Sequence, residues 1–142
     1  ENQVAIRGED RYVPRLEPLP KDAIPSPSDE HLPRQLDITE RGLFENLFWR
    51  KVAGRSPGKG QVKINVAAAG LNFRDVLNAL GTYAGGPVPF GGECAGTLVE
   101  TGETVDDLKP GDRVLAIASH SFSSEAIADS RLVWRIPDGM KF

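Results

Sequence analysis

The chain has 142 residues, a length typical of one folded domain with or without a short extension. Hydrophobic residues make up 39% and charged residues 26%, a balance typical of globular proteins rather than of disordered, fibrous or membrane proteins. The 17 basic and 20 acidic side chains give a net charge of -3, which argues against nucleic acid as a partner.

The counts of cysteine and histidine limit the metal and disulfide chemistry. Cys94 is the only cysteine, which excludes an internal disulfide and is typical of a reducing compartment. With only His31 and His120 beside it, a four-ligand zinc site of the usual spacing cannot be assembled. No apolar run approaches the roughly 20 residues that span a bilayer, and the charged start ENQVAIRGED does not resemble a signal peptide. We therefore expect a cytoplasmic protein without a membrane partner.

Two segments are expected to precede the folded domain. Residues 1–16 place apolar residues on both sides of the turn-like Gly8-Glu9-Asp10, which predicts a short leader hairpin. Residues 17–34 contain five prolines, which remove backbone donors and keep a chain extended. We expect a linker there, with a proline-motif ligand as the alternative. Because the chain opens on Glu1 without an initiator Met, we expect a piece cut from a longer polypeptide.

Short strands are predicted for most of residues 35–142. Within 61–67, apolar Val62, Ile64 and Val66 alternate with polar side chains, the period of a half-buried strand. Four further strands are predicted at 93–100 with a bend at Gly96, and at 113–118, 122–128 and 131–136. Short strands with one short helix between them predict a mainly β fold, a small barrel or rolled sheet.

The short helix is predicted between Asn72 and Gly81. The Asn72 side chain can accept an N–H of the first turn, and Asp75 can return a bond to the cap backbone. Gly81 is expected to end the helix, because glycine tolerates the positive φ of a helix terminus. Four apolar residues at relative positions 0, 3, 4 and 7 share one helix face: Phe73, Val76, Leu77 and Leu80. The loop that follows, AGGPVPFGG, is rich in glycine, which lets backbone approach a ligand closely.

Four phrases carry a resemblance to a known family: GLNFRDVLNALGTY at 70–83, PFGGECAGTLVETG at 89–102, LKPGDRV at 108–114 and RLVWRIPDG at 131–139. From about Ile38 onward the chain resembles the amino-terminal half of medium-chain dehydrogenases/reductases, and among them the enoyl reductase domains of modular polyketide synthases. The resemblance implies that residues 35–142 form a GroES-like, partly open β-barrel with one or more short helices. The leader 1–16 is similar to the seam where the structural part of a ketoreductase precedes such a domain.

In this family, the phrase at Ile136-Pro137-Asp138-Gly139 leads into a Rossmann-type domain that binds NADPH. These 142 residues contain no glycine-rich phosphate loop between a strand and a helix, so we expect the Rossmann domain to be absent from this chain. The resemblance therefore implies that NADP(H) is bound mainly by a nucleotide-binding domain outside the chain. It also implies that the isolated chain is inactive.

Zinc-dependent alcohol dehydrogenases share this half-domain but differ at the metal ligands. They carry a cysteine near the start of the short helix and a His-Glu pair where this sequence has Gly92-Glu93. Asn72 or its neighbours and Gly92 hold those positions here, so we expect no metal. Glu93 is then expected to accept hydrogen bonds from loop amides, and Cys94 to be a small buried hydrophobe.

The resemblance implies reduction of an α,β-unsaturated thioester on the phosphopantetheine arm of an acyl carrier protein. NADPH gives a hydride to the β carbon, and the resulting enolate takes a proton at the α carbon. Tyr83 matches the family tyrosine that acts near the α carbon as proton donor or as a control on α-methyl configuration. Packing on the rim of the site is the alternative for Tyr83. The resemblance also places Asn72, Phe73 and Asp75 at the cofactor, while helix capping explains Asn72 and Asp75 equally well.

Other side chains have less specific interpretations. Arg74 is expected to be a surface ion-pair partner. His120 has little support as a catalytic residue, because no carboxylate that could pair with it lies nearby in the sequence. Trp49 and Trp134 are expected to be core or domain-interface aromatics.

Three alternatives remain open at this point. A quinone or enone oxidoreductase of the same superfamily would act on free small molecules. A non-catalytic GroES-like scaffold domain would keep the barrel and lose the reaction. Within the enoyl reductase interpretation, the hydride chemistry can be diverted, for instance to ring closure on a substrate with a leaving group. The expected partners are an acyl carrier protein, the nucleotide-binding domain and neighbouring synthase domains such as a ketoreductase.

Overall fold

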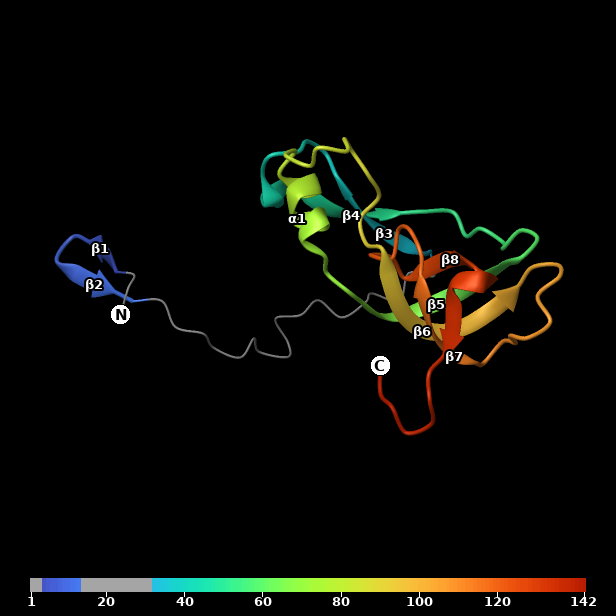
Figure 1. Cartoon of the computed structure of the whole chain (residues 1–142). Coiled ribbons are helices and arrows are strands. Elements are labelled where there is room, and N and C mark those ends of the chain that lie inside the picture. Colours follow the sequence, from blue (N-terminus) through green and yellow to red (C-terminus); the bar gives the residue numbers. More distant parts are fainter. Residues whose placement is uncertain (1–3, 14–31) are drawn as a thin grey trace. The chain divides into compact units, whose positions relative to one another are not determined.

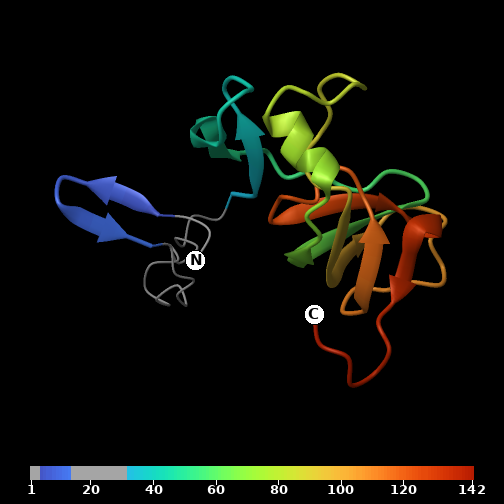
Figure 2. The same cartoon turned by 60° about the vertical axis from the view of Figure 1, so that its left-hand side comes forward.

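The computed structural model describes residues 4–13 and 32–142. These residues fall into two compact units, Glu1–His31 and Leu32–Phe142. Strands account for most of the regular structure (Figures 1 and 2), which confirms the mainly β fold class. None of the helices in the described part of the chain is long and apolar enough to cross a membrane.

The first unit contains the predicted leader hairpin. β1 (Ala5–Arg7) pairs antiparallel with β2 (Asp10–Tyr12), and Gly8 in the turn has a positive φ of 65°. Of the predicted linker 17–34, the part up to residue 31 lies outside the described residues. Arg34 already belongs to a strand of the second unit.

Five antiparallel strands form the main sheet of the second unit, in the order β8-β5-β6-β7-β9. Their bounds are β5 (Gln61–Ala69), β6 (Glu93–Thr101), β7 (Arg113–Ile117), β8 (Glu125–Asp129) and β9 (Val133–Arg135). The sheet curls into a half-barrel (Figures 1 and 2), in agreement with the predicted partly open barrel.

Gly96 allows β6 to bend closely over β5. A side chain at this position would collide with the backbone carbonyl of Asn65 and with the side chain of Ile64. Gly96 pairs with Val66, and the register shifts just beyond that pair, between Val66 and Ala68. Ala67 of β5 has no partner on β6 at this shift, and such a bulge bends the strand that carries the extra residue, here β5. A glycine at position 96 tolerates the close approach of the two strands. β6 is itself curved (Figure 1), and the placement of its bend at Gly96 stays a prediction.

The last two strands begin later than predicted. Residues 122–124 are outside β8, because the backbone N–H of Ser124 and the hydroxyl of Ser123 both donate to the Arg34 carbonyl, each at 2.8 Å. A 3-10 turn, η3 (Ser130–Leu132), precedes β9, because the Asp129 side chain accepts the N–H of Arg131. The Asp129 bond is local and competes with strand pairing, whereas the Ser123 bond reaches Arg34 of β3, 89 residues away along the chain.

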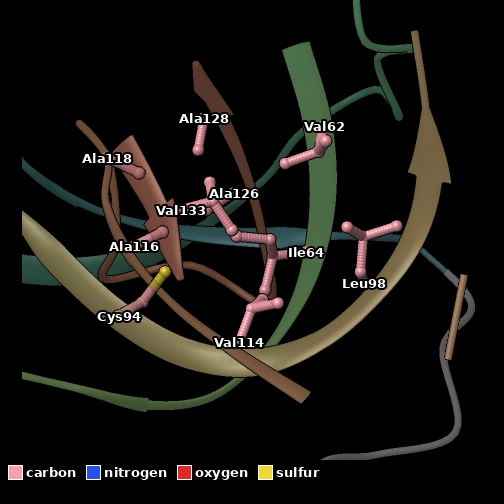
Figure 3. Close-up of a cluster of buried hydrophobic side chains, with 10 residues drawn as sticks. All are labelled: Val62, Ile64, Cys94, Leu98, Val114, Ala116, Ala118, Ala126, Ala128 and Val133. Carbon is pink, nitrogen blue, oxygen red and sulfur yellow. The ribbon is translucent and has the colours of Figure 1, made fainter. Parts of the chain in front are cut away.

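The inner face of the curled sheet is an apolar core. Val62, Ile64, Leu98 and Val114 are fully buried, at alternate positions along their strands. Figure 3 shows these side chains between the curved strands, together with smaller alanines of the same cluster. The complete cluster is Val62, Ile64, Cys94, Leu98, Val114, Ala116, Ala118, Ala126, Ala128 and Val133.

A second, two-stranded sheet supports the helix. β3 (Arg34–Ile38) pairs antiparallel with β4 (Leu47–Lys51), and the 3-10 turn η2 (Phe44–Asn46) lies between them. Ile38 packs with Ala79 of α1 (Phe73–Ala79) and with Phe90 in a second buried cluster. The hairpin therefore holds α1 at one end of the molecule's second unit (Figures 1 and 2).

The helix α1 is capped as predicted. The Asn72 side chain accepts the N–H of Arg74 at 2.9 Å, and the Asp75 carboxylate accepts the N–H of Asn72 at 3.0 Å. Gly81 follows the helix with a φ of 71°. The first turn and the end of the helix are thus determined by local sequence.

The buried face of α1 is not its apolar face. Asp75, Asn78 and Ala79 are buried, whereas Phe73 is 71% exposed. The polar side chains turn inward because the loop after the helix supplies them with hydrogen-bond partners. Of the apolar stripe seen in the sequence, Val76 and Leu77 are half-buried, while Phe73 and Leu80 are left exposed.

Candidate functional site

Asp75 connects the start of α1 to the end of the glycine-rich loop, residues 81–92. Its side chain is only 2% exposed. One carboxylate oxygen accepts the N–H of Asn72, and the other accepts the N–H of Gly91 at 3.0 Å. Hydrogen bonds to a carboxylate are stronger than those between neutral groups, so this link holds helix and loop together firmly.

Asn78 makes a second link to the same loop. Its amide nitrogen donates to the Val88 carbonyl at 2.8 Å, and its oxygen accepts the Val88 N–H at 3.2 Å. The same oxygen accepts from Arg41 Nε at 3.3 Å, which adds the β3–β4 hairpin to the network. Sequence analysis missed this residue. Its position three residues after Asp75, on the same helix face, is the signal that would have revealed it.

Along the sequence, Tyr83 lies between the end of α1 and the loop residues Val88 and Gly91 that bond to the helix. It follows Gly81 and Thr82 in the loop, and its side chain is half-buried. Its carbonyl accepts the N–H of Gly86 at 3.1 Å, a turn that folds the loop back on itself. The loop that carries Tyr83 is thus bonded to α1 at Val88 and Gly91.

Asn72 and Phe73 lie on the exposed side of α1 at its start. The Asn72 oxygen is used by the cap, while no described residue accepts a hydrogen bond from its amide nitrogen. Phe73 is the one aromatic residue of α1, and most of its surface is exposed. Of the three residues expected at a cofactor, Asn72 and Phe73 are therefore accessible, and Asp75 is buried behind them.

Arg74 lies across Gly92. Its Nη2 is 3.6 Å from Asp75 Oδ1, which agrees with the expected ion pair. A Cβ at Gly92 would lie 3.0 Å from Arg74 Nη2, so glycine makes room for the guanidinium. The Nε atom is buried without a hydrogen-bond partner.

Glu93 and Cys94 begin β6 beside these residues. Glu93 is exposed and folds against Gly70, and it borders a shallow pocket of about 360 Å³ with Leu115 and Ile117. Among the described residues, no loop amide donates to the carboxylate of Glu93, so the structure gives that expectation no support. Cys94 is buried, as predicted, and burial raises the pKa of its thiol against a smaller lowering by the hydrogen bond with Ser121. Within the described residues, no group of three or more His, Cys, Asp or Glu side chains is arranged to hold a metal ion.

His120 is held by a structural contact. Its Nδ1 lies 2.5 Å from Gln35 Nε2, so the amide donates and the ring accepts. Burial lowers the pKa of the imidazole, and the cations of Arg55 and Arg50 lower it further. The backbone at His120 has a φ of 62°, a conformation that histidine tolerates better than most side chains.

The outer face of the sheet carries apolar side chains without a cover in this unit. Trp134 is 47% exposed, and Leu115 and Ile117 on the neighbouring strand are exposed as well. Trp49 on β4 is also exposed, so neither tryptophan is a core residue. The interface interpretation of both tryptophans stays a prediction. Contiguous exposed apolar surface of this kind marks contact sites.

Comparison with known proteins agrees with this architecture. The family of the alcohol dehydrogenase GroES-like domain matches residues 58–135. The chain is 38% identical over 139 residues to erythronolide synthase EryA2 of Saccharopolyspora erythraea, covering 96% of the chain and 4% of that synthase. It thus spans only a small part of this relative.

Solved structures of related enzymes share this fold. The CurK enoyl reductase superposes with a TM-score of 0.74 at 37% identity, covering 78% of this chain and 37% of that one. An Escherichia coli quinone oxidoreductase complexed with NADPH superposes with a TM-score of 0.68 at 25% identity, covering 77% of this chain and 35% of that one. The chain therefore belongs to the alcohol dehydrogenase GroES-like domain family, with the enoyl reductase domains of modular polyketide synthases among its relatives.

Proposed function

We propose that this chain is the substrate-side half of an NADPH-dependent, zinc-independent enoyl reductase in a modular polyketide synthase. Its substrate is an α,β-unsaturated acyl group held as a thioester on an acyl carrier protein. The observation that carries the proposal is the double attachment of the Tyr83 loop, at Val88 and Gly91, to the helix whose start exposes Asn72 and Phe73. The similarity to the CurK enoyl reductase supports the choice of reaction.

The accessible residues at the helix start fit a nicotinamide. An exposed aromatic ring offers a flat apolar surface, and an amide nitrogen without a partner offers a donor for a carboxamide oxygen. Phe73 and Asn72 would hold the nicotinamide end of NADP(H), and Asp75 would position Asn72. The remainder of the cofactor would be held by a nucleotide-binding domain outside these residues. When bound, NADPH supplies the hydride that reduces the β carbon.

Tyr83 supplies the proton in this proposal. Hydride addition leaves an enolate, whose α carbon takes the proton as the O–H bond of the phenol breaks. The phenolate regains a proton from water. A phenol with a usual pKa of about 10 is a weak acid, but an enolate is basic enough to accept its proton. Loop attachment through Asp75 and Asn78 would keep the phenol in one place during this transfer.

Further parts of the proposal concern partners. The acyl carrier protein would deliver the substrate on its phosphopantetheine arm, and a ketoreductase would be among the neighbouring synthase domains. Similarity to erythronolide synthase supports this setting. A quinone oxidoreductase is the second candidate, because a quinone oxidoreductase also superposes on this chain.

The test measures NADPH oxidation with a crotonyl thioester. The 142-residue chain is compared with the same chain continued through its nucleotide-binding domain, and with Tyr83→Phe in the longer protein. We expect turnover only in the longer protein, no change on addition of a metal chelator, and a loss of about 10²- to 10⁴-fold in Tyr83→Phe. Preference for a benzoquinone over the thioester would favour the second candidate, and turnover of neither would favour a scaffold.

A further inference from the structure

The position of Tyr83 depends on a short segment of its own loop. The far end of the loop is bonded to α1, since Asn78 pairs with Val88 and Asp75 accepts the N–H of Gly91. Before the tyrosine, the Thr82 N–H donates to the Leu77 carbonyl at 2.9 Å, and after it the Tyr83 carbonyl accepts the Gly86 N–H at 3.1 Å. These bonds hold the backbone on both sides of Tyr83, and none of them holds the phenol ring.

Gly85 lies against that ring. A Cβ placed on Gly85 would lie 2.7 Å from Cε1, 3.2 Å from Cζ and 3.4 Å from Cδ1 of the Tyr83 ring. These three ring atoms are the nearest non-neighbouring atoms to that point. Because Cζ carries the hydroxyl, the edge of the ring that rests on Gly85 includes the hydroxyl end.

The backbone does not require glycine at this position. The φ of Gly85 lies outside the left-handed region, whereas the adjacent Gly86 has a φ of 77°. A Cβ at Gly86 would meet nothing within 4 Å. Gly86 thus allows the positive φ of the turn, whereas the absence of a side chain at Gly85 leaves room for the Tyr83 ring.

We infer that Gly85 is a positioning residue, which fixes the hydroxyl of Tyr83 by letting the ring lie against the loop backbone. The inference rests on the proposed function, in which that hydroxyl donates the α proton. An alanine at position 85 would push away the hydroxyl end of the ring, since contacts under 3 Å cannot persist. The half-buried ring can turn on its side-chain bonds, so the loop keeps its fold and the phenol is displaced.

The contact is tested on the 142-residue chain with 3-fluorotyrosine and ¹⁹F NMR. The chain has two tyrosines, so Tyr12→Phe leaves Tyr83 as the one fluorine signal. We expect Gly85→Ala to shift this signal. Gly54→Ala is the matched control, because a Cβ there meets nothing within 4 Å and its φ is not left-handed. An unshifted signal in Gly85→Ala would overturn the inference.

The consequence for catalysis is tested in the longer, NADPH-binding protein. Displacing a reacting group by roughly 1 Å costs up to about 10²-fold, so we expect Gly85→Ala to lower kcat by roughly 10- to 100-fold. In the Tyr83→Phe background the same substitution should change kcat less than about twofold, because the hydroxyl is already absent. With an α-methyl substrate, Gly85→Ala should also give a mixture of α configurations, which general damage to the fold would not produce.

Two outcomes separate this inference from the proposed function. Equal losses of kcat from Gly85→Ala with and without the Tyr83 hydroxyl would overturn the positioning role. A shifted fluorine signal together with full activity of Tyr83→Phe would overturn the acid role of Tyr83 in the proposed function and would still support the contact.

Discussion

The curled sheet and the helix–loop region of the second unit are held together by different forces. The sheet buries apolar side chains such as Ile64 and Leu98, which have no preferred partner direction. The helix–loop region buries Asp75 and Asn78, whose hydrogen bonds have defined distances and directions. Apolar packing tolerates exchange among side chains of similar volume, whereas a buried polar group must keep its partner. The sheet core therefore provides stability, and the polar network determines where the loop lies against α1.

Removing volume from the sheet core should have the largest effect on stability. Ile64→Ala empties space in a fully buried position, and we expect unfolding to become easier by about 2–5 kcal/mol in urea titrations. Leu115→Ala, on the exposed outer face of the same sheet, is the control and should cost less than about 1 kcal/mol. Equal losses from the two substitutions would mean that the inner face is not the main source of stability.

Removing the Asp75 carboxylate should have the next largest effect. Asp75→Ala leaves the N–H groups of Asn72 and Gly91 without acceptors, which should cost about 2–3 kcal/mol. Amide hydrogen exchange at Gly91 should become faster, because its bond to the helix is lost. The exposed Asp106 serves as control, and Asp106→Ala should leave exchange at Gly91 unchanged. Unchanged protection of Gly91 in Asp75→Ala would contradict the assignment.

Asn78 allows a sharper test, because its hydrogen-bond donor to Val88 can be removed while its acceptor is kept. Asn78→Asp keeps an oxygen for the Val88 N–H and Arg41 but loses the donor to the Val88 carbonyl. Asn78→Asp also sets a buried carboxylate oxygen against that carbonyl, so we expect losses of about 1–3 kcal/mol in both Asn78→Asp and Asn78→Leu, measured by thermal unfolding. Amide hydrogen exchange at Val88 should be faster in Asn78→Leu than in Asn78→Asp, because the carboxylate still accepts the Val88 N–H. Equal exchange at Val88 in Asn78→Leu and in the unchanged chain would contradict the assignment.

The smallest effect is expected at an exposed ion pair at the end of β8, away from the sheet core and from the helix–loop region. The Arg131 side chain lowers the pKa of the Asp129 carboxyl from 3.8 to about 2. A carboxyl with a lowered folded pKa contributes stability above the unfolded value, and the contribution is lost as pH falls from 3.8 towards 2. In an NMR titration, Arg131→Gln should return the pKa of Asp129 towards its usual value, and Lys141→Gln should not. An unchanged Asp129 pKa in Arg131→Gln would contradict this cause.

Local sequence was sufficient for much of the fold. The helix start was predictable because Asn72 and Asp75 complete a capping box within four residues. The strand β5 was predictable because its apolar residues alternate. The later start of β8 was not predictable, since it depends on a bond from Ser123 to Arg34, 89 residues away along the chain. The later start of β9 depends on a local bond between Asp129 and Arg131, a side-chain turn that the alternation of apolar residues does not reveal.

For the candidate site, the sequence by itself determined the family and the residues of the phrase around Asn72 and Tyr83, because a motif keeps its residue types in order along the chain. Only the tertiary structure decided which side of α1 is buried. The helix period groups Phe73 with Leu80, but Asp75 and Asn78 also bond to backbone groups ten or more residues away in the loop. Burial follows those bonds, because a buried polar side chain is stable only where a partner of matching geometry meets it, and that geometry exists only once the chain has folded.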